Sequence, residues 1–260
     1  MPGLSVHRSG VVATLVIDNA HKRNALSAEM WQQFPPLLSR LASDDSVKVL
    51  IVRGAGEDFS AGADISELDG ILHAPTGQDG GYLTEGENAL ARFPRPTIAA
   101  IDGFCVGGGW QLAAACDIRL ASSRASFGVT PSRIGIVYPL SGIERLVSVA
   151  GIAVAKYLLF SGDLVDAPTA ERWGMVTSVV EPQDLWSEAA SLANRLAARS
   201  QLSIQAMKQI VDAIASGADA SAVNLRWQEE IAGSDDPAIG AAAFAAKRAP
   251  VFTWAPRPAD

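Results

Sequence analysis

The sequence predicts an α/β fold with a mostly parallel sheet, and three observations carry that prediction. Short β-branched apolar segments alternate with segments of helical period as far as about residue 149. The chain has 260 residues, of which 48% are hydrophobic and 19% charged, so it can bury a large core. Beyond that point the chain is rich in alanine and has helical periodicity only. We therefore expect a core over residues 1–200 and a helical region over residues 201–260.

The first elements alternate as an α/β fold requires. Residues 11–18 and 47–53 are β-branched segments and predict two strands. Between them, Ser27 is a typical N-cap and predicts a helix as far as about residue 41, which the pair Pro35 and Pro36 should break or kink. Residues 66–93 are rich in glycine and weakly periodic, which predicts a mobile, partly helical flap.

The rest of the chain adds two strands and a series of helices. Residues 97–101 and 118–121 predict strands, the first of which ends in a turn and three consecutive glycines. Helices are expected at about 143–149, 153–160, 167–172, 183–199, 203–215, 219–231 and 237–248. Their apolar residues recur at helical spacing, which is typical of core or subunit packing.

Composition excludes several classes of function. The net charge of −7, without a basic segment interleaved with aromatic residues, excludes a nucleic-acid-binding surface. The N-terminal segment lacks the apolar core of a signal peptide, and no apolar run of about 18 residues is present that could span a bilayer. Cys105 and Cys116 have neither a metal-ligand spacing nor a disulfide pattern. We therefore expect a soluble cytoplasmic protein with no metal site and no membrane contact.

Two glycine-rich loops carry the main indication of function. FSAGADI, residues 59–65, follows one predicted strand, and the triplet at residues 107–109 follows another. If these strands are neighbours, both loops lie at the edge where open α/β sheets bind ligands. A glycine turn that leads into a helix leaves backbone N–H groups unpaired at the positive end of the helix dipole. Two such groups would form an oxyanion hole; the alternative is that the glycines only allow close packing.

Five segments resemble, in this order, the enoyl-CoA hydratase/isomerase (crotonase) superfamily: FSAGADI, IDGFCVGGG, CDIRLAS, residues 127–146 and AFAAKRAPVF. The resemblance implies a crotonase fold of repeated ββα units with a C-terminal helical trimerisation region. It also implies a homotrimer or a hexamer built from two trimers. The implied substrate is an acyl-CoA thioester, and no separate cofactor is expected because coenzyme A is part of that substrate. The two N–H groups that hold the enolate map onto Ala63 and Gly108.

The same resemblance implies contacts with coenzyme A and with the acyl group. The residues that match CoA contacts are Arg23, Ala25, Ala61, Asp64, Ile65 and Lys247. We expect Arg23 to bind a phosphate and Lys247 to reach one, often from a neighbouring subunit; a solvated surface charge is the alternative for each. Leu68 and Trp110 are candidate walls of the acyl pocket, with core packing as the alternative.

This chain departs from the family at the acid–base positions. Hydratases of the family carry one glutamate three residues after the middle glycine of the triplet and another in an FGxPE segment. Here these positions hold Gln111 and Pro131, and neither side chain can act as a general base. A further acid position, beyond the segment GIVYP, holds Leu140 and Ser141. The chain therefore keeps the expected anion hole without the expected bases.

Decarboxylation of a malonyl-type thioester needs no side-chain base, because departing carbon dioxide leaves the enolate behind. The pattern FxxTPxxxGxxY resembles the methylmalonyl-CoA decarboxylase branch, in which the tyrosine at the position of Tyr138 lies in the active site. We expect Tyr138 to bond the departing carboxylate or to relay a proton, and Gln111 to orient that carboxylate. Pro131 is expected to contact the substrate. The alternatives are a buried structural tyrosine and an amide that only packs near a helix start.

Two other functions stay open on the sequence. A hydratase or isomerase of fatty-acid metabolism would need a different acid or base, and the flap supplies His73, Glu67, Asp69, Glu85 and Glu87 as candidates. The third hypothesis is a protein that binds acyl-CoA without turning it over.

Overall fold

A six-stranded sheet forms the centre of the computed structural model, which describes residues 2–256. Its strand order is β1-β2-β3-β4-β6-β9. Strand β1 (Gly3–Ser9) pairs antiparallel with β2 (Val12–Asp18). The other pairs are parallel. Strand β2 pairs with β3 (Val49–Gly54), β3 with β4 (Thr97–Ile101), β4 with β6 (Ile118–Ser122), and β6 with β9 (Ser178–Val180). The prediction of a mostly parallel sheet is confirmed.

A second, smaller sheet was not predicted. It has the order β5-β7-β8 and consists of β5 (Phe104–Val106), β7 (Ser126–Gly128) and β8 (Leu164–Asp166). Each of these strands has three residues, which is too short for an alternating pattern to be visible in the sequence. Strand β5 follows β4 after a two-residue turn, so the small sheet begins directly beside the glycine triplet.

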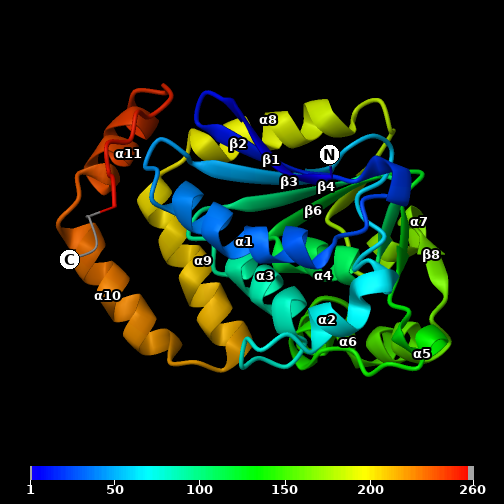
Figure 1. Ribbon diagram of the computed structural model, residues 1–260. Coiled ribbons are helices and arrows are strands. Elements are labelled where there is room, and N and C mark those ends of the chain that lie inside the picture. The colour runs from blue at the N-terminus through cyan, green and yellow to red at the C-terminus, as the bar shows by residue number, and fades with distance from the viewer. Residues whose placement is uncertain (1, 257–260) are drawn as a thin grey trace.

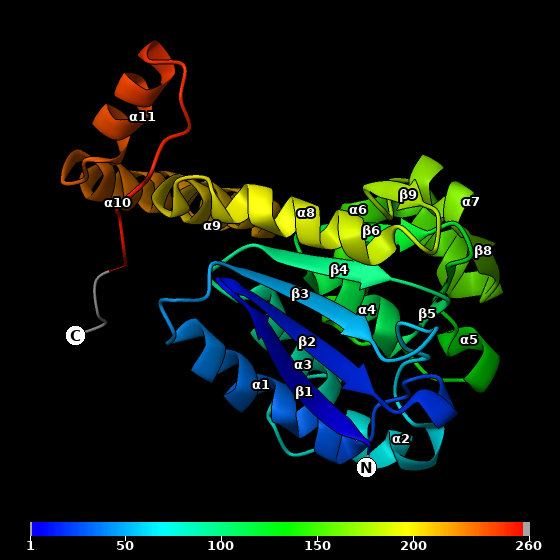
Figure 2. The same cartoon turned by 90° about the horizontal axis from the view of Figure 1, so that it is seen from above.

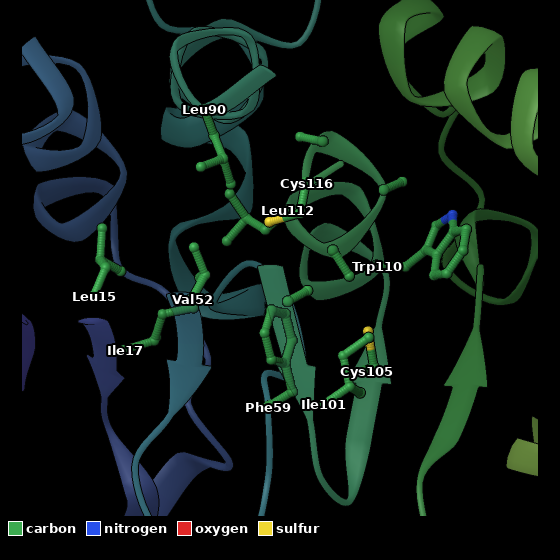
Figure 3. Packing of buried hydrophobic residues seen from close by; sticks show 14 of the residues in the cluster. Leu15, Ile17, Val52, Phe59, Leu90, Ile101, Cys105, Trp110, Leu112 and Cys116 are labelled. Atoms are coloured by element: carbon green, nitrogen blue, oxygen red, sulfur yellow. The ribbon is translucent and has the colours of Figure 1, made fainter. Parts of the chain in front are cut away.

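Helices cover both faces of the large sheet, as Figures 1 and 2 show. Helices α1 (Ala28–Ala42), α3 (Gly81–Ala91) and α4 (Gly108–Ala115) lie on one face. Helix α8 (Leu185–Ala197) lies on the other, where its buried residues pack against apolar side chains of β2, β3, β4 and β6. Figure 3 shows the larger core, in which Phe59 lies near Val52 and Ile101 below α4.

Helix α1 continues through Pro35 and Pro36, so the expected break is absent, while the kink named as its alternative stays a prediction. The helix begins as predicted, because the Ser27 hydroxyl accepts a hydrogen bond from Met30 N at 3.2 Å. Each proline removes one backbone hydrogen bond. Six apolar side chains of the helix are nevertheless buried on its inner face, and this packing outweighs the lost bonds.

The segment expected to be a flap is packed on the core over much of its length. It contains the 3₁₀ helix η2 (Ile65–Glu67), the short helix α2 (Leu68–Leu72) and helix α3. Helix α3 lies so close to α1 that a Cβ on Gly86 would be 3.0 Å from the Trp31 ring. Its position next to α1 and α4 makes α3 a wall of the site described below.

The helices after the small sheet largely follow the prediction. Helix α5 (Pro131–Ile134) is a single turn that was not predicted. Helix α6 (Leu140–Ser161) is interrupted at Gly151, whose φ of 79° is not helical, so it consists of the two helices expected there. Helix α7 (Ala167–Arg172) is confirmed. A second 3₁₀ turn, η1 (Ala20–Lys22), precedes α1.

The C-terminal helices extend beyond the body of the molecule (Figure 2). They are α9 (Gln201–Ser216), α10 (Ala220–Ala232) and α11 (Asp236–Ala245). Helix α9 is tied to the core by an ion pair, in which Lys208 Nζ lies 2.8 Å from Asp117 Oδ2. The expected division after residue 200 falls between α8 and α9 and stays a prediction. Within residues 2–256, no helix combines the length and the apolar character that crossing a membrane requires.

Candidate active site

The two glycine-rich loops lie side by side at one edge of the sheet. Strands β3 and β4 are parallel neighbours, as the oxyanion-hole hypothesis requires. Phe59 N donates to Asp102 O at 2.7 Å, and Ser60 N donates to Phe104 O at 2.8 Å. These bonds continue the pairing of the two strands into the loops, so the chain after β3 reaches the start of α4.

The Ala63 N–H group is free because the hydrogen bonds that fix its loop are made by the residues on either side of it. Leu26 N donates to Gly62 O, and Asp64 N donates to Leu26 O, each at 2.8 Å. Residues on both sides of Ala63 are thus bonded to the segment before α1. No hydrogen bond from Ala63 N is present within residues 2–256. The loop therefore presents one backbone donor that has no acceptor in that part of the chain.

Gly108 supplies the second donor because it is the first residue of α4. The N–H groups of a first helical turn have no partner within the helix, and the helix dipole favours negative charge beside them. A Cβ on Gly108 would lie 3.2 Å from Ala63 N, so the two residues are immediate neighbours. Two adjacent free N–H groups are the arrangement that stabilises a developing oxyanion.

A pocket of about 60 Å³ opens beside these donors. Its walls come from the loop after β3, from α2, α3, α4 and α5, and from the segment before α6. The lining residues are Ala61, Ala63, Ile65, Leu68, Leu72, Leu83, Gly107, Gly108, Gln111, Thr130, Pro131, Ile134, Ile136, Tyr138 and Pro139. Among them only Tyr138 has a side chain that titrates. The pocket is mainly aliphatic, and the described residues contribute no carboxylate to its lining.

Tyr138 lies in the pocket wall with its hydroxyl engaged. The Oη–H group donates to Gly107 O at 2.8 Å, and the side chain is buried. Burial raises the pKa of Tyr138 well above its usual value, and the charge of Glu87 adds to this. Tyr138 therefore stays protonated and is a hydrogen-bond donor that also contacts the turn before Gly108.

Gln111 is a polar side chain of the pocket that lacks a partner. It is 1% exposed, and neither Nε2 nor Oε1 has a hydrogen-bond partner within the described residues. Leaving such atoms buried and unpaired costs roughly 1–3 kcal/mol. The amide therefore stands ready to pair with a polar group of a ligand in the pocket.

The expected CoA contacts fall around the pocket mouth or outside it. Ala61 and Ile65 line the pocket. Arg23 is exposed, with its guanidinium 4.2 Å from the centre of the Phe104 ring, and it borders a separate hollow with Asp58 and Arg124. Ala25 does not line the pocket and accepts a hydrogen bond from Asn19 Nδ2 at 2.7 Å. Arg23 is joined to the site through the bond from Ala61 N to Arg23 O.

Asp64 has a structural partner that the sequence analysis missed. Its carboxylate lies 2.6 Å from Lys22 Nζ and also accepts bonds from Ser66. These contacts, led by the Lys22 hydrogen bond, lower the pKa of Asp64 to about 2. Lys22 directly precedes Arg23 in the segment HKRNAL, and this position beside an expected CoA contact is the feature of the sequence that could have indicated a role for Lys22 near the site. Asp64 does not line the pocket, and its observed role is to hold the Ala63 loop.

Trp110 and Lys247 are not at the pocket. Trp110 is fully buried in the core beside Phe127, and Figure 3 shows its side chain pointing away from α4, so the expected acyl wall is corrected to core packing. Leu83 occupies the wall next to Gly108 instead. Lys247 is exposed just after α11, at the end of the molecule away from α2 and α5 (Figures 1 and 2). Its expected role across a subunit boundary stays a prediction.

The candidate acids and bases of the flap lie outside the pocket lining. Glu67 accepts a hydrogen bond from Ala28 N at 2.9 Å, and His73 is paired with Asp69 on the surface. Glu85 is half-buried and Glu87 is fully buried, but none of these side chains lines the pocket. No group of three or more histidine, cysteine, aspartate or glutamate side chains able to hold a metal occurs between residues 2 and 256.

Comparisons with known proteins identify the family to which this fold belongs. Residues 7–255 match the family model "Enoyl-CoA hydratase/isomerase". The chain is 34% identical over 211 residues to a short-chain-enoyl-CoA hydratase of Clostridium acetobutylicum, covering 80% of each sequence. It is 32% identical over 253 residues to a probable enoyl-CoA hydratase of Mycobacterium tuberculosis, covering 95% of this chain and 96% of the relative.

Solved structures show the same likeness. An enoyl-CoA hydratase/isomerase family member superimposes with a TM-score of 0.93 at 38% identity, covering 99% of this chain and 100% of its own. A putative family protein from Hyphomonas neptunium gives a TM-score of 0.89 at 32% identity, with 98% of each chain covered. The fold is thus the α/β crotonase fold with a C-terminal helical region, and the chain belongs to the enoyl-CoA hydratase/isomerase family.

The names of these relatives favour hydration over decarboxylation. They describe enoyl-CoA hydratases, as does that of a crotonyl-CoA hydratase of Syntrophomonas wolfei that is 32% identical over 198 residues. The family and an enzyme acting on acyl-CoA are therefore supported, whereas the decarboxylase branch has no support from them.

Proposed function

We propose that this protein binds an acyl-CoA thioester and stabilises the enolate formed from it between the N–H groups of Ala63 and Gly108. The observation that carries this proposal is the pair of adjacent backbone donors at the pocket, which have no acceptor among residues 2–256. Negative charge on the thioester oxygen is stabilised there more strongly than the neutral carbonyl, which lowers the barrier. We place the CoA moiety along Ala61 and Ile65 at the pocket mouth, with Arg23 towards its phosphates. No cofactor besides the CoA of the substrate is needed, and we expect the reaction to take place in the cytoplasm.

The composition of the pocket favours decarboxylation as the specific reaction. The described lining residues include no carboxylate, and their one titrating side chain, Tyr138, is held protonated by burial. In decarboxylation the bond between the α-carbon and the substrate carboxylate breaks, and its electron pair forms the enolate. Gln111 Nε2 would donate to that carboxylate before it leaves, and an uncharged pocket would not repel it. Water then protonates the α-carbon, and the hydroxide that remains combines with the released carbon dioxide to give bicarbonate.

Hydration or isomerisation is the second candidate, and the names of the relatives favour it. Hydration needs a group that activates water and one that protonates the α-carbon. Neither Gln111 nor Pro131 can do this, and Glu87 is bound to side chains of α6 instead of facing the pocket. A hydratase would therefore have to use a group of the substrate or a rearranged flap.

One experiment separates these reactions. The purified protein is incubated separately with methylmalonyl-CoA and with crotonyl-CoA, and the thioester products are followed by mass. Loss of carbon dioxide from the first thioester with no change of the second supports decarboxylation. Addition of water to crotonyl-CoA without decarboxylation establishes the hydratase and eliminates the decarboxylase. Binding of both thioesters without turnover, over a wide panel of acyl groups, identifies an acyl-CoA binder.

A further inference from the structure

Glu87 is a buried carboxylate that the proposed function does not use. It lies on the inner face of α3 and is 0% exposed. A carboxylate without water is strongly unfavourable unless charged and hydrogen-bonding partners surround it. Burial accordingly raises the pKa of Glu87, while Arg145 and Ser141 oppose that shift. The partners of this side chain therefore indicate what it does.

The partners of Glu87 lie on the first turns of α6. The Ser141 hydroxyl donates to Glu87 Oε1, and Arg145 Nη1 lies 3.0 Å from the same oxygen. Arg145 Nη2 also donates to Asn88 Oδ1 at 2.6 Å, one residue further along α3. Leu140 N, at the start of α6, donates to Asp79 Oδ2 at 2.8 Å. The beginning of α6 is thus held by α3 and by the loop before it.

The same turn of α6 packs on two pocket residues. Gly142 follows Ser141, and a Cβ at this position would overlap the Gln111 amide and lie 2.8 Å from Tyr138 Cε1. The backbone of α6 therefore lies directly against the Gln111 side chain. Since neither polar atom of that amide is hydrogen-bonded within residues 2–256, packing is what determines its direction.

We propose that Glu87 is a positioning residue that, through Ser141, holds the first turn of α6 against Gln111 and so fixes how the amide is presented to the acyl group. The inference rests on the proposed function, because it assigns Gln111 to a polar substituent of the acyl group. Glu87 itself does not line the pocket; its Oε1 atom accepts from Ser141 and lies beside Arg145, and its Oε2 atom has no hydrogen-bond partner within residues 2–256. Its effect is geometric, and a small displacement of a contact group lowers turnover markedly.

The test compares Glu87→Ala, Glu87→Gln and Ser141→Ala with the full-length wild-type protein. Glu87→Gln keeps an oxygen acceptor for Ser141 and is the conservative rescue. We expect Glu87→Ala and Ser141→Ala to lower kcat/KM for the thioester that is turned over about 10- to 100-fold. Glu87→Gln should retain more activity than Glu87→Ala. The affinity for coenzyme A alone should stay within about twofold, because it does not involve Gln111. The double variant should have a kcat/KM no lower than that of Glu87→Ala alone, since both changes break the same hydrogen bond between Ser141 and Glu87.

A matched control is Asp166→Asn, which makes the same carboxylate-to-amide change at the N-cap of α7, away from the pocket. It should lower Tm without changing kcat/KM. If Glu87→Ala and Ser141→Ala behave like this control, the positioning role is wrong. If Glu87→Gln is as inactive as Glu87→Ala while Ser141→Ala is unaffected, Glu87 is a base, and the proposal is also overturned.

A structural readout keeps this test separate from the proposed function. In protein labelled with ¹⁵N-glutamine, the side-chain amide signal of Gln111 is assigned by its absence from Gln111→Leu. We expect that signal to shift or broaden in Glu87→Ala and Ser141→Ala and to stay unchanged in Asp166→Asn. An unmoved signal in the first two variants overturns the positioning role whether or not the wild type turns over a thioester. If the signal moves and no thioester reacts, only the proposed function fails.

Discussion

Gly108 contributes to the site by lacking a side chain. A Cβ there would lie 3.0 Å from Trp31 Cζ2, 3.2 Å from Ala63 N and 3.3 Å from Leu83 Cδ1, so these neighbours, the other donor included, would have to move. Its backbone angles are helical, so the substitution to alanine brings no left-handed strain.

We therefore expect Gly108→Ala, which keeps the N–H group but displaces the two donors relative to each other, to lower kcat by about 10²–10³-fold, a loss of the size seen when an oxyanion-hole donor is removed. Turnover of the substrate found in the product assay measures this, with Tm as the check on folding. Gly70→Ala on α2 is the matched control, because a Cβ there meets no atom within 4 Å. Equal activity of the two variants would contradict the expectation that the added Cβ disturbs the two donors.

Tyr138 connects the pocket wall to the turn before α4. Its hydroxyl donates to Gly107 O, whose residue directly precedes the donor Gly108. Tyr138→Phe removes this bond while it keeps the ring and its packing.

For Tyr138→Phe we expect turnover to fall by at least about 10-fold with a loss of stability of about 1 kcal/mol. Burial raises the pKa of Tyr138 well above its usual value. The pH dependence of the rate should therefore show no ionisation of Tyr138 between about pH 6 and pH 8. A pH–rate profile of both proteins checks this. Unchanged turnover would assign Tyr138 to packing alone.

At the scale of elements, the loop that carries Ala63 is held by charged contacts on its far side. Asp64 is 9% exposed and pairs with Lys22, and Glu67 accepts from Ala28 N at the start of α1. These contacts fix the loop relative to α1 without entering the pocket.

We expect Asp64→Asn to destabilise the protein at neutral pH. The pKa of Asp64 is lowered from 3.8 to about 2, so the folded state binds a proton there less readily than the unfolded state. Its contribution is therefore complete above the unfolded pKa of 3.8 and is lost as the pH falls towards 2. Urea unfolding of wild type and Asp64→Asn across this range should show a difference in free energy that shrinks with falling pH. A difference that is constant with pH would contradict the assignment.

At the scale of the whole molecule, the C-terminal helices leave apolar side chains without cover. Met207, Val211 and Ile214 on α9 are 57%, 62% and 66% exposed, and Phe244 on α11 is 87% exposed. A helix whose apolar face is exposed in a monomer is typical of subunit packing.

We expect light scattering to give a trimer or a hexamer, as the family resemblance implies. Val211→Glu should shift the distribution towards monomers, because it places a charge on this face. The control is Arg40→Glu, a charge change at an exposed position of α1, which should leave the assembly intact. A wild-type protein that elutes as a monomer would contradict the expectation.

Much of the fold and part of the site were accessible from local patterns. Alternating strands and helices predicted a mostly parallel sheet, but only the structure showed that β3 and β4 are neighbours, the condition for both glycine loops to lie at one edge. The interrupted helix α6 followed from periodicity on each side of Gly151. The three-residue strands were not predictable, because pairing with distant segments creates them.

Chain order and residue type were sufficient to identify the class of fold and the two glycine-rich loops. The family resemblance mapped the candidate donors onto Ala63 and Gly108 and the missing carboxylates onto Gln111 and Pro131. Only the packed molecule showed that Trp110 belongs to the core and that Asp64 is paired with Lys22. It also revealed the link from Glu87 through Ser141 to the helix that packs on Gln111. Such contacts join residues far apart in the chain, and their burial and direction depend on how α3, α4 and α6 pack together.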